Sequence, residues 1–272
     1  MNRAAALAHQ RYSELADEPV CLDVLEFNAR AHYALLPQLG HAVRLTHLSD
    51  ARLAGLVYRE SGVAAVGDRI RIEAAAGDGV AWRQPSAARF DPAPLGFAAV
   101  LTLLARTLVA QPSEPGAARM PYPSGGALYP VLPFLCRTSL SVADWPAGQD
   151  IFQVLPFSRS LEPLPARADA PSLLAALSGD AAGALGQPAF ALVYAVHLDK
   201  AVFKYRYRGF RLAQMEVGSM YQRVTEQAQA MGLASRVWAG FSDCRVASRL
   251  GLDATQVLPM VVQFLGTPAA PC

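Results

Sequence analysis

The segment FKYRYRGFR, residues 203–211, places a lysine beside a tyrosine within a run of arginines. The chain has 24 lysine and arginine residues, and only Lys200 and Lys204 are lysines. A lysine is a poor base at neutral pH unless burial or neighbouring positive charge favours its neutral form. Arginine cannot replace it, because the guanidinium stays protonated. Lys204 and Tyr205 therefore predict a proton-transfer centre, in which Tyr205 takes the proton directly or relays it while Lys204 stabilises the phenolate.

Two other interpretations of this segment remain open. In a regular strand Lys204 and Tyr205 would point to opposite faces, so the catalytic interpretation requires a turning backbone, which the nearby Gly209 allows. Aromatic rings between cations are also typical of a surface on which RNA bases stack. The formal net charge of +2 is nearly neutral and argues against a dedicated nucleic-acid-binding protein. We therefore expect no nucleic-acid partner.

A second candidate site is PYPSGGALYP, residues 121–130, which sets Ser124, Gly125 and Gly126 between two prolines. Glycines allow backbone amides to approach a flat or anionic ligand closely. The segment has neither the glycine spacing and lysine of a phosphate-binding loop nor the GxGxxG pattern of a dinucleotide site. Taken alone, it is more typical of a tight surface turn than of a ligand site.

Composition argues against several other classes of site. The four cysteines are far apart and the five histidines lack metal-binding spacing, so we expect neither a metal site nor a disulfide framework. No apolar run reaches the roughly 18–20 residues of a membrane span, and the first residues do not form a secretory signal. We therefore expect a cytoplasmic protein with no membrane partner.

The elements that would position both motifs are a mixture of helices and strands. Hydrophobic periodicity predicts helices over 22–36, 91–110, 171–179 and 211–232, and strands over 68–74, 131–137, 190–198 and 257–266. We also expect a loop over 111–130, a hairpin over 139–156 and a turn-rich connection over 235–243. Helices and strands mixed around one sheet predict the α+β class.

Both motifs resemble segments of the nitroreductase superfamily, in the form of SagB-type dehydrogenases that make thiazole and oxazole rings. PYPSGGALYP resembles their flavin-contacting loop. FKYRYRGFR, followed by RVWAGFSD and VLPMVVQFLG, is similar to the azoline dehydrogenases of microcin-B-type synthetases. The resemblance covers roughly residues 82–266 in the expected order.

The resemblance implies an FMN-dependent dehydrogenase that oxidises peptide thiazolines and oxazolines to thiazoles and oxazoles, with molecular oxygen as acceptor. It implies that Lys204 and Tyr205 are the catalytic pair. The implied FMN-binding residues are Arg83 and Ser86 at the phosphate, Pro123, Ser124, Gly125 and Gly126 at the ring or ribityl chain, and Ala239 and Gly240 near N5. The basic pair with which many nitroreductases close the phosphate site near the C-terminus is missing here, and Arg236 and Arg245 are the candidate substitutes.

The same resemblance implies a nitroreductase-like mixed sheet flanked by helices over residues 81–272, with FMN at a homodimer interface. Residues 1–80 would form an N-terminal α/β extension that docks partners. The expected partners are ATP-dependent cyclodehydratase subunits of a synthetase and a precursor peptide. The dimer helix would use the periodic stripe Leu212, Met215, Ser219, Met220 and Val224, which fits the core helix of a monomer equally well.

Two alternative functions remain at this stage. An NAD(P)H-dependent nitro- or quinone reductase of the same superfamily needs no separate dinucleotide motif. A non-catalytic scaffold subunit of the synthetase would have no flavin.

Overall fold

The computed structural model describes residues 12–31, 49–57, 71, 83–111, 119–165 and 169–269. The chain divides into two compact units, one formed by residues 1–42 with 85–272 and the other by residues 43–84. The described helix of the second unit is α3 (Asp50–Val57). The strand expected over 68–74 lies outside the described residues, apart from Arg71.

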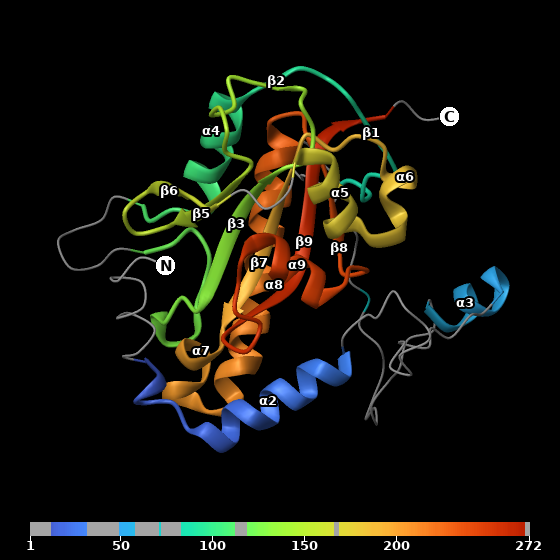
Figure 1. Cartoon of the computed structure of the whole chain (residues 1–272). Helices are drawn as coiled ribbons and strands as arrows, with labels where there is room; N and C mark the ends of the chain where they lie inside the picture. The colour runs from blue at the N-terminus through green and yellow to red at the C-terminus, as the bar shows by residue number, and fades with distance from the viewer. Residues whose placement is uncertain are drawn as a thin grey trace. The chain divides into compact units, whose positions relative to one another are not determined.

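A seven-stranded sheet forms the centre of the first unit (Figure 1). Its order is β1-β9-β7-β3-β5-β6, β8 also pairs with β9, and every pairing of these strands is antiparallel. The strands are β1 (Phe90–Asp91), β3 (Val131–Arg137), β5 (Ile151–Leu155), β6 (Ser160–Pro163), β7 (Phe190–His197), β8 (Ala234–Trp238) and β9 (Val257–Pro268). Among the described strands, parallel pairing is confined to β2 (Leu95–Gly96) with β4 (Val142–Ala143).

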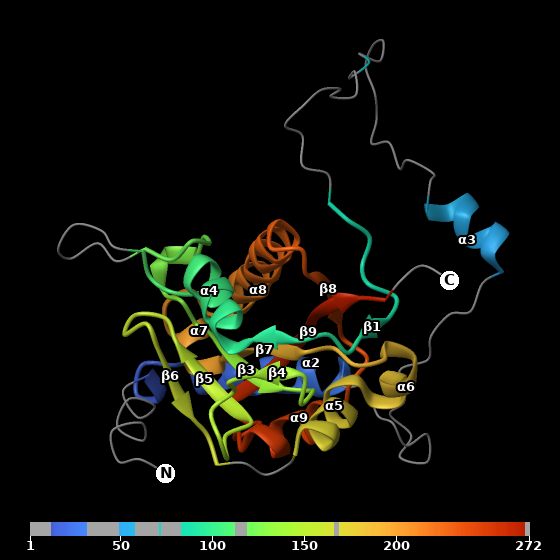
Figure 2. The same ribbon diagram turned by 90° about the horizontal axis from the view of Figure 1, so that it is seen from above.

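Helices cover both faces of the sheet, which confirms the expected α+β class. The helices are α2 (Glu18–Ala31), α4 (Phe97–Thr107), α5 (Ala170–Ser178), α6 (Ala182–Leu185), α7 (Leu198–Tyr205), α8 (Tyr207–Ala230) and α9 (Asp243–Leu250), with single 3₁₀ turns η2 (Gly125–Ala127) and η3 (Gly179–Ala181). Seen from above, α4 and α8 lie on one side of the sheet and α5 and α9 on the other (Figure 2).

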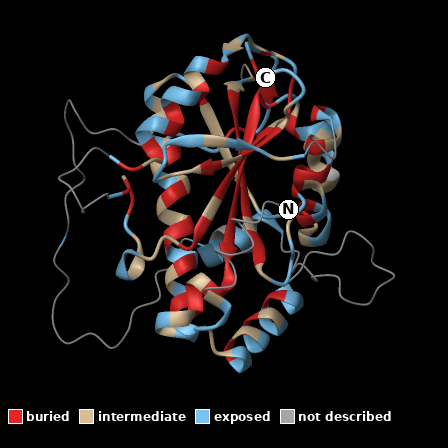
Figure 3. Ribbon diagram, turned by 60° about the vertical axis from the view of Figure 1, so that its left-hand side comes forward, coloured by how far each residue is buried: buried red, intermediate tan, exposed pale blue. Residues whose placement is uncertain are grey.

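The central strand β7 separates two hydrophobic cores. All eight of its residues are buried, as the red strands at the centre of Figure 3 show. Its even-numbered residues from Phe190 to Val196 pack with α4 and α8, and its odd-numbered residues from Ala191 to Ala195 pack with α5 and α9. This division follows from the two-residue period of a strand, since successive side chains point to opposite faces.

A buried polar network fixes α8 against this sheet. The Tyr194 hydroxyl of β7 donates to Gln263 Oε1 of β9 at 2.7 Å. The Gln263 amide in turn donates to the Tyr221 carbonyl at 3.2 Å and to Thr225 Oγ1 at 3.0 Å, both on α8. Buried polar groups cost free energy unless they are paired, so this network favours one position of α8 over the sheet.

The strongly apolar strands were predicted closely. Strands β3, β7 and β9 and helices α5 and α8 confirm the elements expected over 131–137, 190–198, 257–266, 171–179 and 211–232. Helix α2 begins at Glu18, before the expected residue 22, and residues 32–36 of the expected helix lie outside the described part.

Three local predictions were wrong because strand pairing overrode local pattern. The helix expected from residue 91 begins at Phe97, since residues 90–91 pair with β9 and residues 95–96 with β4. The hairpin expected over 139–156 does not form, because β5 pairs with β3 while β4 pairs with β2. The connection expected over 235–243 contains β8, which pairs along β9.

A close approach of two helices sets the direction in which α8 leaves α7. A Cβ atom added at Gly209 in the first turn of α8 would lie 1.9 Å from the carbonyl oxygen of Ala201 in α7. The junction residue Arg206 has φ 51° and ψ −135°, which ends α7 and begins α8. Glycine at position 209 therefore allows α8 to contact α7, and the turn at Arg206 sets the direction in which α8 leaves α7.

We expect Gly209→Ala to destabilise the fold by about 1–3 kcal/mol, because the added methyl group forces α7 and α8 apart. Gly218→Ala on the same helix is the matched control, since its Cβ would meet only Tyr221 Oη, at 3.8 Å. Alanine there should stabilise the helix by up to about 1 kcal/mol. Urea unfolding of both variants measures the difference, and equal effects of the two substitutions would contradict a packing constraint at the corner.

Candidate active site

The backbone turns directly after Lys204 and Tyr205 rather than at the pair itself. Both residues end α7, and the left-handed residue Arg206 follows directly. The segment is therefore helical rather than a strand, so the strand alternative is wrong for this segment. The two side chains lie close together, since Lys204 Nζ is 5.1 Å from the centre of the Tyr205 ring.

Lys204 and Tyr205 differ in exposure. Tyr205 is half-buried, whereas Lys204 is exposed in the single chain. Any desolvation of the Lys204 ammonium must therefore come from a bound molecule or from a second chain.

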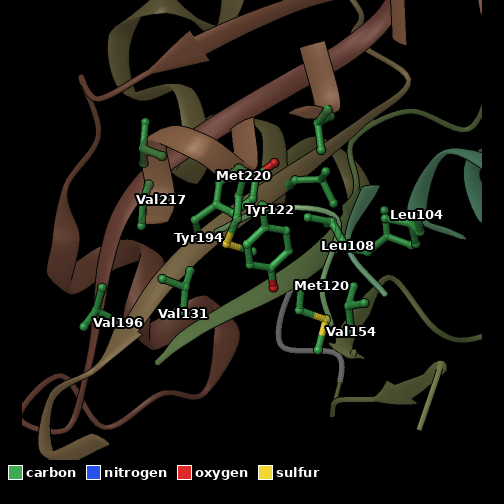
Figure 4. Packing of buried hydrophobic residues seen from close by; sticks show 14 of the residues in the cluster. Leu104, Leu108, Met120, Tyr122, Val131, Val154, Tyr194, Val196, Val217 and Met220 are labelled. Carbon is green, nitrogen blue, oxygen red and sulfur yellow. The ribbon is translucent and has the colours of Figure 1, made fainter. Parts of the chain in front are cut away.

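The glycine-rich loop is anchored in the core by a residue at its start, Tyr122. Tyr122 is buried beside Tyr194 and Met220 in the core that carries α8 (Figure 4). Inside the loop, Ser124 Oγ accepts a hydrogen bond from the Tyr129 amide at 2.9 Å. A buried aromatic residue and a local side-chain bond thus fix the loop on the sheet.

The loop contains an unusual concentration of left-handed backbone. Gly126 has φ 67°, and Ala127 and Tyr129 have φ 54° and 49°. For residues other than glycine, such conformations cost on the order of 1–3 kcal/mol each and cluster at functional sites. The conformation of this loop is therefore held by its surroundings rather than by the intrinsic preference of its residues.

The two motifs singled out in the sequence meet in space at Gly126 and Tyr205. A Cβ atom added at Gly126 would lie 2.6 Å from Tyr205 Oη, and one added at Gly125 would lie 2.8 Å from Leu212 Cδ1. Only glycine allows the loop to come this close to the end of α7 and the start of α8. The approach sets the candidate proton-transfer phenol directly against the glycine-rich loop.

A narrow pocket lies between the loop and the α7–α8 corner. In the single chain it is too narrow to admit a water molecule. Its lining residues are Gly125, Leu128, Pro130, Ala201, Tyr205, Gly209, Leu212, Ala213 and Glu216. The pocket thus brings an ionisable carboxyl group, Glu216, beside the predicted catalytic tyrosine.

Glu216 is the most unusual ionisable group of this site. Its side chain is 2% exposed, and neither carboxylate oxygen has a hydrogen-bond partner within the described residues. Burial raises the pKa of Glu216 to about 7. The pKa of Glu216 is lowered by three nearby groups, the Ser124 side chain, the Val131 amide and the Lys200 ammonium. None of them makes a hydrogen bond of normal geometry to the carboxylate. Near neutral pH this carboxyl group can therefore hold or release a proton.

Two other ionisable groups share the environment of Glu216. Burial lowers the pKa of Lys200, while the charge of Glu216 opposes that shift. Burial, and then the charge of Glu216, raise the pKa of Tyr122, whose hydroxyl also has no partner within the described residues. Glu216, Lys200 and Tyr122 thus form a cluster of interacting ionisable groups, in which Glu216 and Tyr122 are buried and Lys200 is half-buried.

Sequence reasoning missed these three residues. Lys200 was left without a role although it is one of only two lysines, and Glu216 lies on a helix whose periodicity was used only for packing. Glu216 lies four residues after Leu212, on the same face of the helix as the apolar stripe. This position could have indicated a special role, because a carboxyl group on an apolar helix face is either paired or functional.

The expected phosphate residues belong to a second group of contacts. Ser86 is exposed at the start of a segment that runs along β8, where the Ala87 amide donates to the Ser235 carbonyl at 3.1 Å. Arg236 Nη1 donates to the Ala87 carbonyl at 3.1 Å. Of the two substitute arginines considered, Arg236 bonds to the residue that follows Ser86, and Arg245 is exposed on α9.

The remaining predicted residues lie around this second group or outside it. Ala239 and Gly240 directly follow β8, and a Cβ atom added at Gly240 would lie 2.9 Å from the Trp238 ring. Pro123 is exposed beside Ser124 in the glycine-rich loop. Arg83 is an exposed residue of the other compact unit. The described contacts thus gather the site residues into two groups, one at the loop and Tyr205 and the other at β8.

The stripe proposed for dimer contact divides between two environments. Met220 and Val224 are fully buried in this chain's own core, which leaves them unavailable for a partner. Met215 is 61% exposed and Leu101 on the neighbouring α4 is 42% exposed.

Within the described residues, no group of three or more metal-binding side chains occurs. No described helix is long and apolar enough to cross a membrane.

Comparisons with known proteins agree with this arrangement. A model of the nitroreductase family matches residues 86–266, a range that contains both motifs. The chain is 41% identical over 256 residues to the microcin B17-processing protein McbC of Escherichia coli, covering 92% of this chain and 91% of that protein. It also matches a chain in the structure of the E. coli microcin synthetase McbBCD complex with truncated pro-MccB17 bound. That match has TM-score 0.85 and 37% identity, and covers 96% of this chain and 97% of the other.

We expect Glu216→Gln to remove part of the pH dependence of stability. The folded-state pKa of about 7 exceeds the ordinary 4.5. The contribution of this group is therefore fully present below about pH 4.5 and is lost as pH rises to about 7. A shift of this size corresponds to roughly 3 kcal/mol. Glutamine keeps the shape of the protonated acid and cannot ionise, so the variant lacks this loss.

Urea unfolding at several pH values between about 4.5 and 8 measures the effect. The stability of Glu216→Gln relative to the wild type should rise through this window and level off above it. The matched control is Glu162→Gln, at an exposed position on β6. A difference between Glu216→Gln and wild type that stays constant across the window would refute the raised pKa.

Proposed function

The chain belongs to the nitroreductase family, and on that premise we propose that it is an FMN-dependent azoline dehydrogenase. It oxidises thiazoline and oxazoline rings of a ribosomally made precursor peptide to thiazoles and oxazoles, with molecular oxygen as the final acceptor. The observation that carries the proposal is the contact of Tyr205 with Gly126. This contact brings together the glycine-rich loop and the segment FKYRYRGFR. The residues of these two motifs and their order in the chain resemble those of azole-forming dehydrogenases.

The proposed reaction removes two hydrogens from adjacent carbons of the ring. One leaves as a proton, and the other leaves as a hydride. Bound FMN supplies the hydride acceptor, which no amino-acid side chain provides. The protein itself must therefore supply a base, a pocket that orients the ring, and contacts that hold the flavin.

Tyr205 and Lys204 are the proposed base. The Tyr205 hydroxyl faces the loop against which the flavin would lie, and the Lys204 ammonium is near its ring. A cation near a phenol stabilises negative charge that develops on the oxygen. Tyr205 is thus placed to take the ring proton while Lys204 stabilises the resulting charge.

Glu216 gives this proton a destination inside the protein. It lines the same narrow pocket as Tyr205 and is able to change protonation state near neutral pH. An acid whose pKa lies near the working pH both accepts and releases a proton readily. We include Glu216 in the proposal as the acceptor that follows Tyr205.

The residues of both contact groups fit FMN chemically. Gly125 and Gly126 expose backbone on a loop without side chains, which suits a flat ring. Arg236 bonds to the Ala87 carbonyl directly after Ser86, and the two residues offer a guanidinium and a hydroxyl for a phosphate. Arg83 is the further phosphate candidate from the sequence. Ala239 and Gly240 follow the same strand as Arg236 and remain the proposed amide donors near N5.

We propose that the protein acts as a homodimer. The exposed Met215 and Leu101 give α8 and α4 an apolar surface that can meet a second chain. In a twofold pair, the loop group of one chain and the β8 group of its partner would build each flavin site together. Such an arrangement would also supply the desolvation that the single chain does not give Lys204.

The proposed partners are ATP-dependent cyclodehydratase subunits, which make the azolines, and the precursor peptide that carries them. The relative in the McbBCD complex supports a role within such a synthetase. An ATP-dependent partner places the reaction in the cytoplasm. Residues 1–80 are the proposed docking extension ahead of the catalytic domain over 81–272. Its described helix α2 turns Leu22 and Phe27 outward, 57% and 61% exposed.

Loss of the base should stop oxidation after the ring has formed. With wild-type protein, cyclodehydratase and precursor, mass spectrometry should show the loss of a water and then of two hydrogens per ring. Lys204→Ala and Tyr205→Phe should stop after the water loss, with kcat lowered on the order of 10²-fold or more. Their flavin absorbance should equal that of the wild type, because neither side chain is assigned to cofactor binding.

Gly126→Ala tests whether the contact itself matters. Gly148→Ala is its matched control, because Gly148 has a similar φ of 71° but open space around its Cβ position. Both variants carry similar backbone strain, yet only Gly126→Ala displaces Tyr205 and should slow oxidation.

Flavin-loaded Lys204→Ala and Tyr205→Phe that oxidise at the wild-type rate would refute the proposed base. Rapid reduction of the flavin by NAD(P)H would favour a nitro- or quinone reductase, and a protein that never takes up FMN would favour a scaffold.

Charged residues on the outer face of α2 should weaken assembly without unfolding the chain. We expect Leu22→Glu with Phe27→Glu to reduce co-purification with the cyclodehydratase at least tenfold, because a buried interface residue of this size contributes more than about 1 kcal/mol. Leu140→Glu, at an even more exposed position (73%) in the β3–β4 connection, serves as control. Unchanged assembly of the α2 variant would remove this helix from the docking surface.

A further inference from the structure

Asp17, the residue directly before α2, makes two contacts at once. Asp17 Oδ1 accepts a hydrogen bond from the Val20 amide at 3.4 Å and thereby caps the helix. Asp17 Oδ2 forms an ion pair with the guanidinium of Arg206. The N-terminal helix is thus tied to the residue that directly follows the Lys204–Tyr205 pair.

The core fixes the position of Asp17 relative to α7 and α8. Val20 and Val24 on the inner face of α2 are 0% and 4% exposed and belong to the same hydrophobic core as both helices. Figure 1 shows α2 lying across the end of the unit where α7 and α8 meet. Because α2 is anchored in this core, its carboxylates are fixed points for the corner.

A second carboxylate of α2 holds the next residue of the corner. The hydroxyl of Tyr207 donates a hydrogen bond to Asp23 Oδ2. Arg206 and Tyr207 are consecutive, so two acidic side chains from one helix hold adjacent residues of the turn. The contacts begin directly after Tyr205.

The turn needs such support because of its backbone. Arg206 has φ 51° and ψ −135°, a conformation that glycine adopts freely and other residues rarely do. Its side chain is 58% exposed, so packing does little to hold it there. The backbone bonds on either side run from the Arg206 amide to the Val202 carbonyl, and from the Gly209 amide to the Arg206 carbonyl. These bonds exist only while the turn keeps its shape.

We propose that Asp17, supported by Asp23, is a positioning residue for the reaction: it holds Arg206 in its left-handed conformation and so keeps the Tyr205 phenol against Gly126. The role of Tyr205 in this statement rests on the function proposed above. The inference assigns to the N-terminal helix a part in building the active site, in addition to its proposed part in docking.

A general stabilising role does not explain this arrangement. Partly exposed ion pairs contribute little to overall stability, whereas misplacing a catalytic group by about 1 Å can lower a rate on the order of 10²-fold. The local effect of the pair on the turn is therefore the larger expected consequence. The measurement must report on the turn itself.

Asp17→Ser separates the two contacts of Asp17. Serine caps a helix about as well as aspartate but is too short to reach Arg206. Hydrogen exchange in the flavin-loaded full chain should become on the order of tenfold faster at the Arg206 and Gly209 amides. Tyr207→Phe should produce a smaller increase at the same amides. Glu26→Gln, which breaks only the exposed pair of Glu26 with Arg30 on the same helix, is the control and should change neither amide.

Arg206→Gly provides a rescue test, because glycine adopts the same backbone conformation without support. In this background Asp17→Ser should change neither amide exchange nor kcat by more than about twofold, whereas in the wild-type background it should lower kcat on the order of tenfold and leave KM unchanged. A direct effect of the Asp17 charge on Lys204 would persist in the Arg206→Gly background and would overturn the positioning role.

The two readouts separate this inference from the proposed function. Unchanged exchange at Arg206 and Gly209 in Asp17→Ser overturns the inference whatever the catalytic activity. Faster exchange and the glycine rescue, with an unaltered oxidation rate, also overturn it, because Asp17 then shapes the turn without serving Tyr205. If the wild-type synthetase oxidises no azoline, the proposed function fails, and the exchange data alone decide whether Asp17 holds the turn.

Discussion

The approach of Gly209 to the Ala201 carbonyl oxygen constrains the whole candidate site. Without a side chain at position 209, α8 can start against α7 rather than beside it. The turn at Arg206 then leaves Tyr205 as the last helical residue of α7, where its hydroxyl meets Gly126. The hydrogen bonds of Tyr194 and Gln263 connect α8 to the central strands β7 and β9 and hold the helix in this position. The α7–α8 corner and the glycine-rich loop thus pack directly against each other.

The site contains features that reduce stability and suit chemistry. The Glu216 carboxyl group, which has no partner within the described residues, the half-buried Lys200 and the left-handed residues of the glycine-rich loop each cost free energy. Glu216 lines the narrow pocket beside Gly125 of the loop, and its charge acts on Lys200. The hydrophobic cores on both faces of β7 offset such costs. Perturbed ionisable groups gathered in one pocket are typical of active sites.

Helix α2 links the N-terminal part of the first unit to the candidate site. Helix α2 buries one face in the core of the first unit, turns a second face with exposed leucine and phenylalanine outward, and reaches the α7–α8 corner with its aspartates. This helix joins the hydrophobic core to the turn that follows Tyr205, and its exposed face is the surface proposed for docking. In a synthetase, contact between subunits at α2 would then act directly beneath the residues proposed to carry out the oxidation.

Continuous or periodic apolar patterns predicted β3, β7, β9 and α8, and residue types and spacing singled out the two motifs of the site. The catalytic interpretation required a turn at Lys204 and Tyr205, but helix α7, which ends at Tyr205, was not predicted. No local pattern indicated strands at residues 90–91, 95–96 and 234–238, because their pairing partners lie far away in the chain. The packing of the elements brings Glu216 to the pocket beside the loop and Asp17 to Arg206. Local pattern records which face of an element is buried, but contacts between side chains distant in sequence depend on how the elements pack.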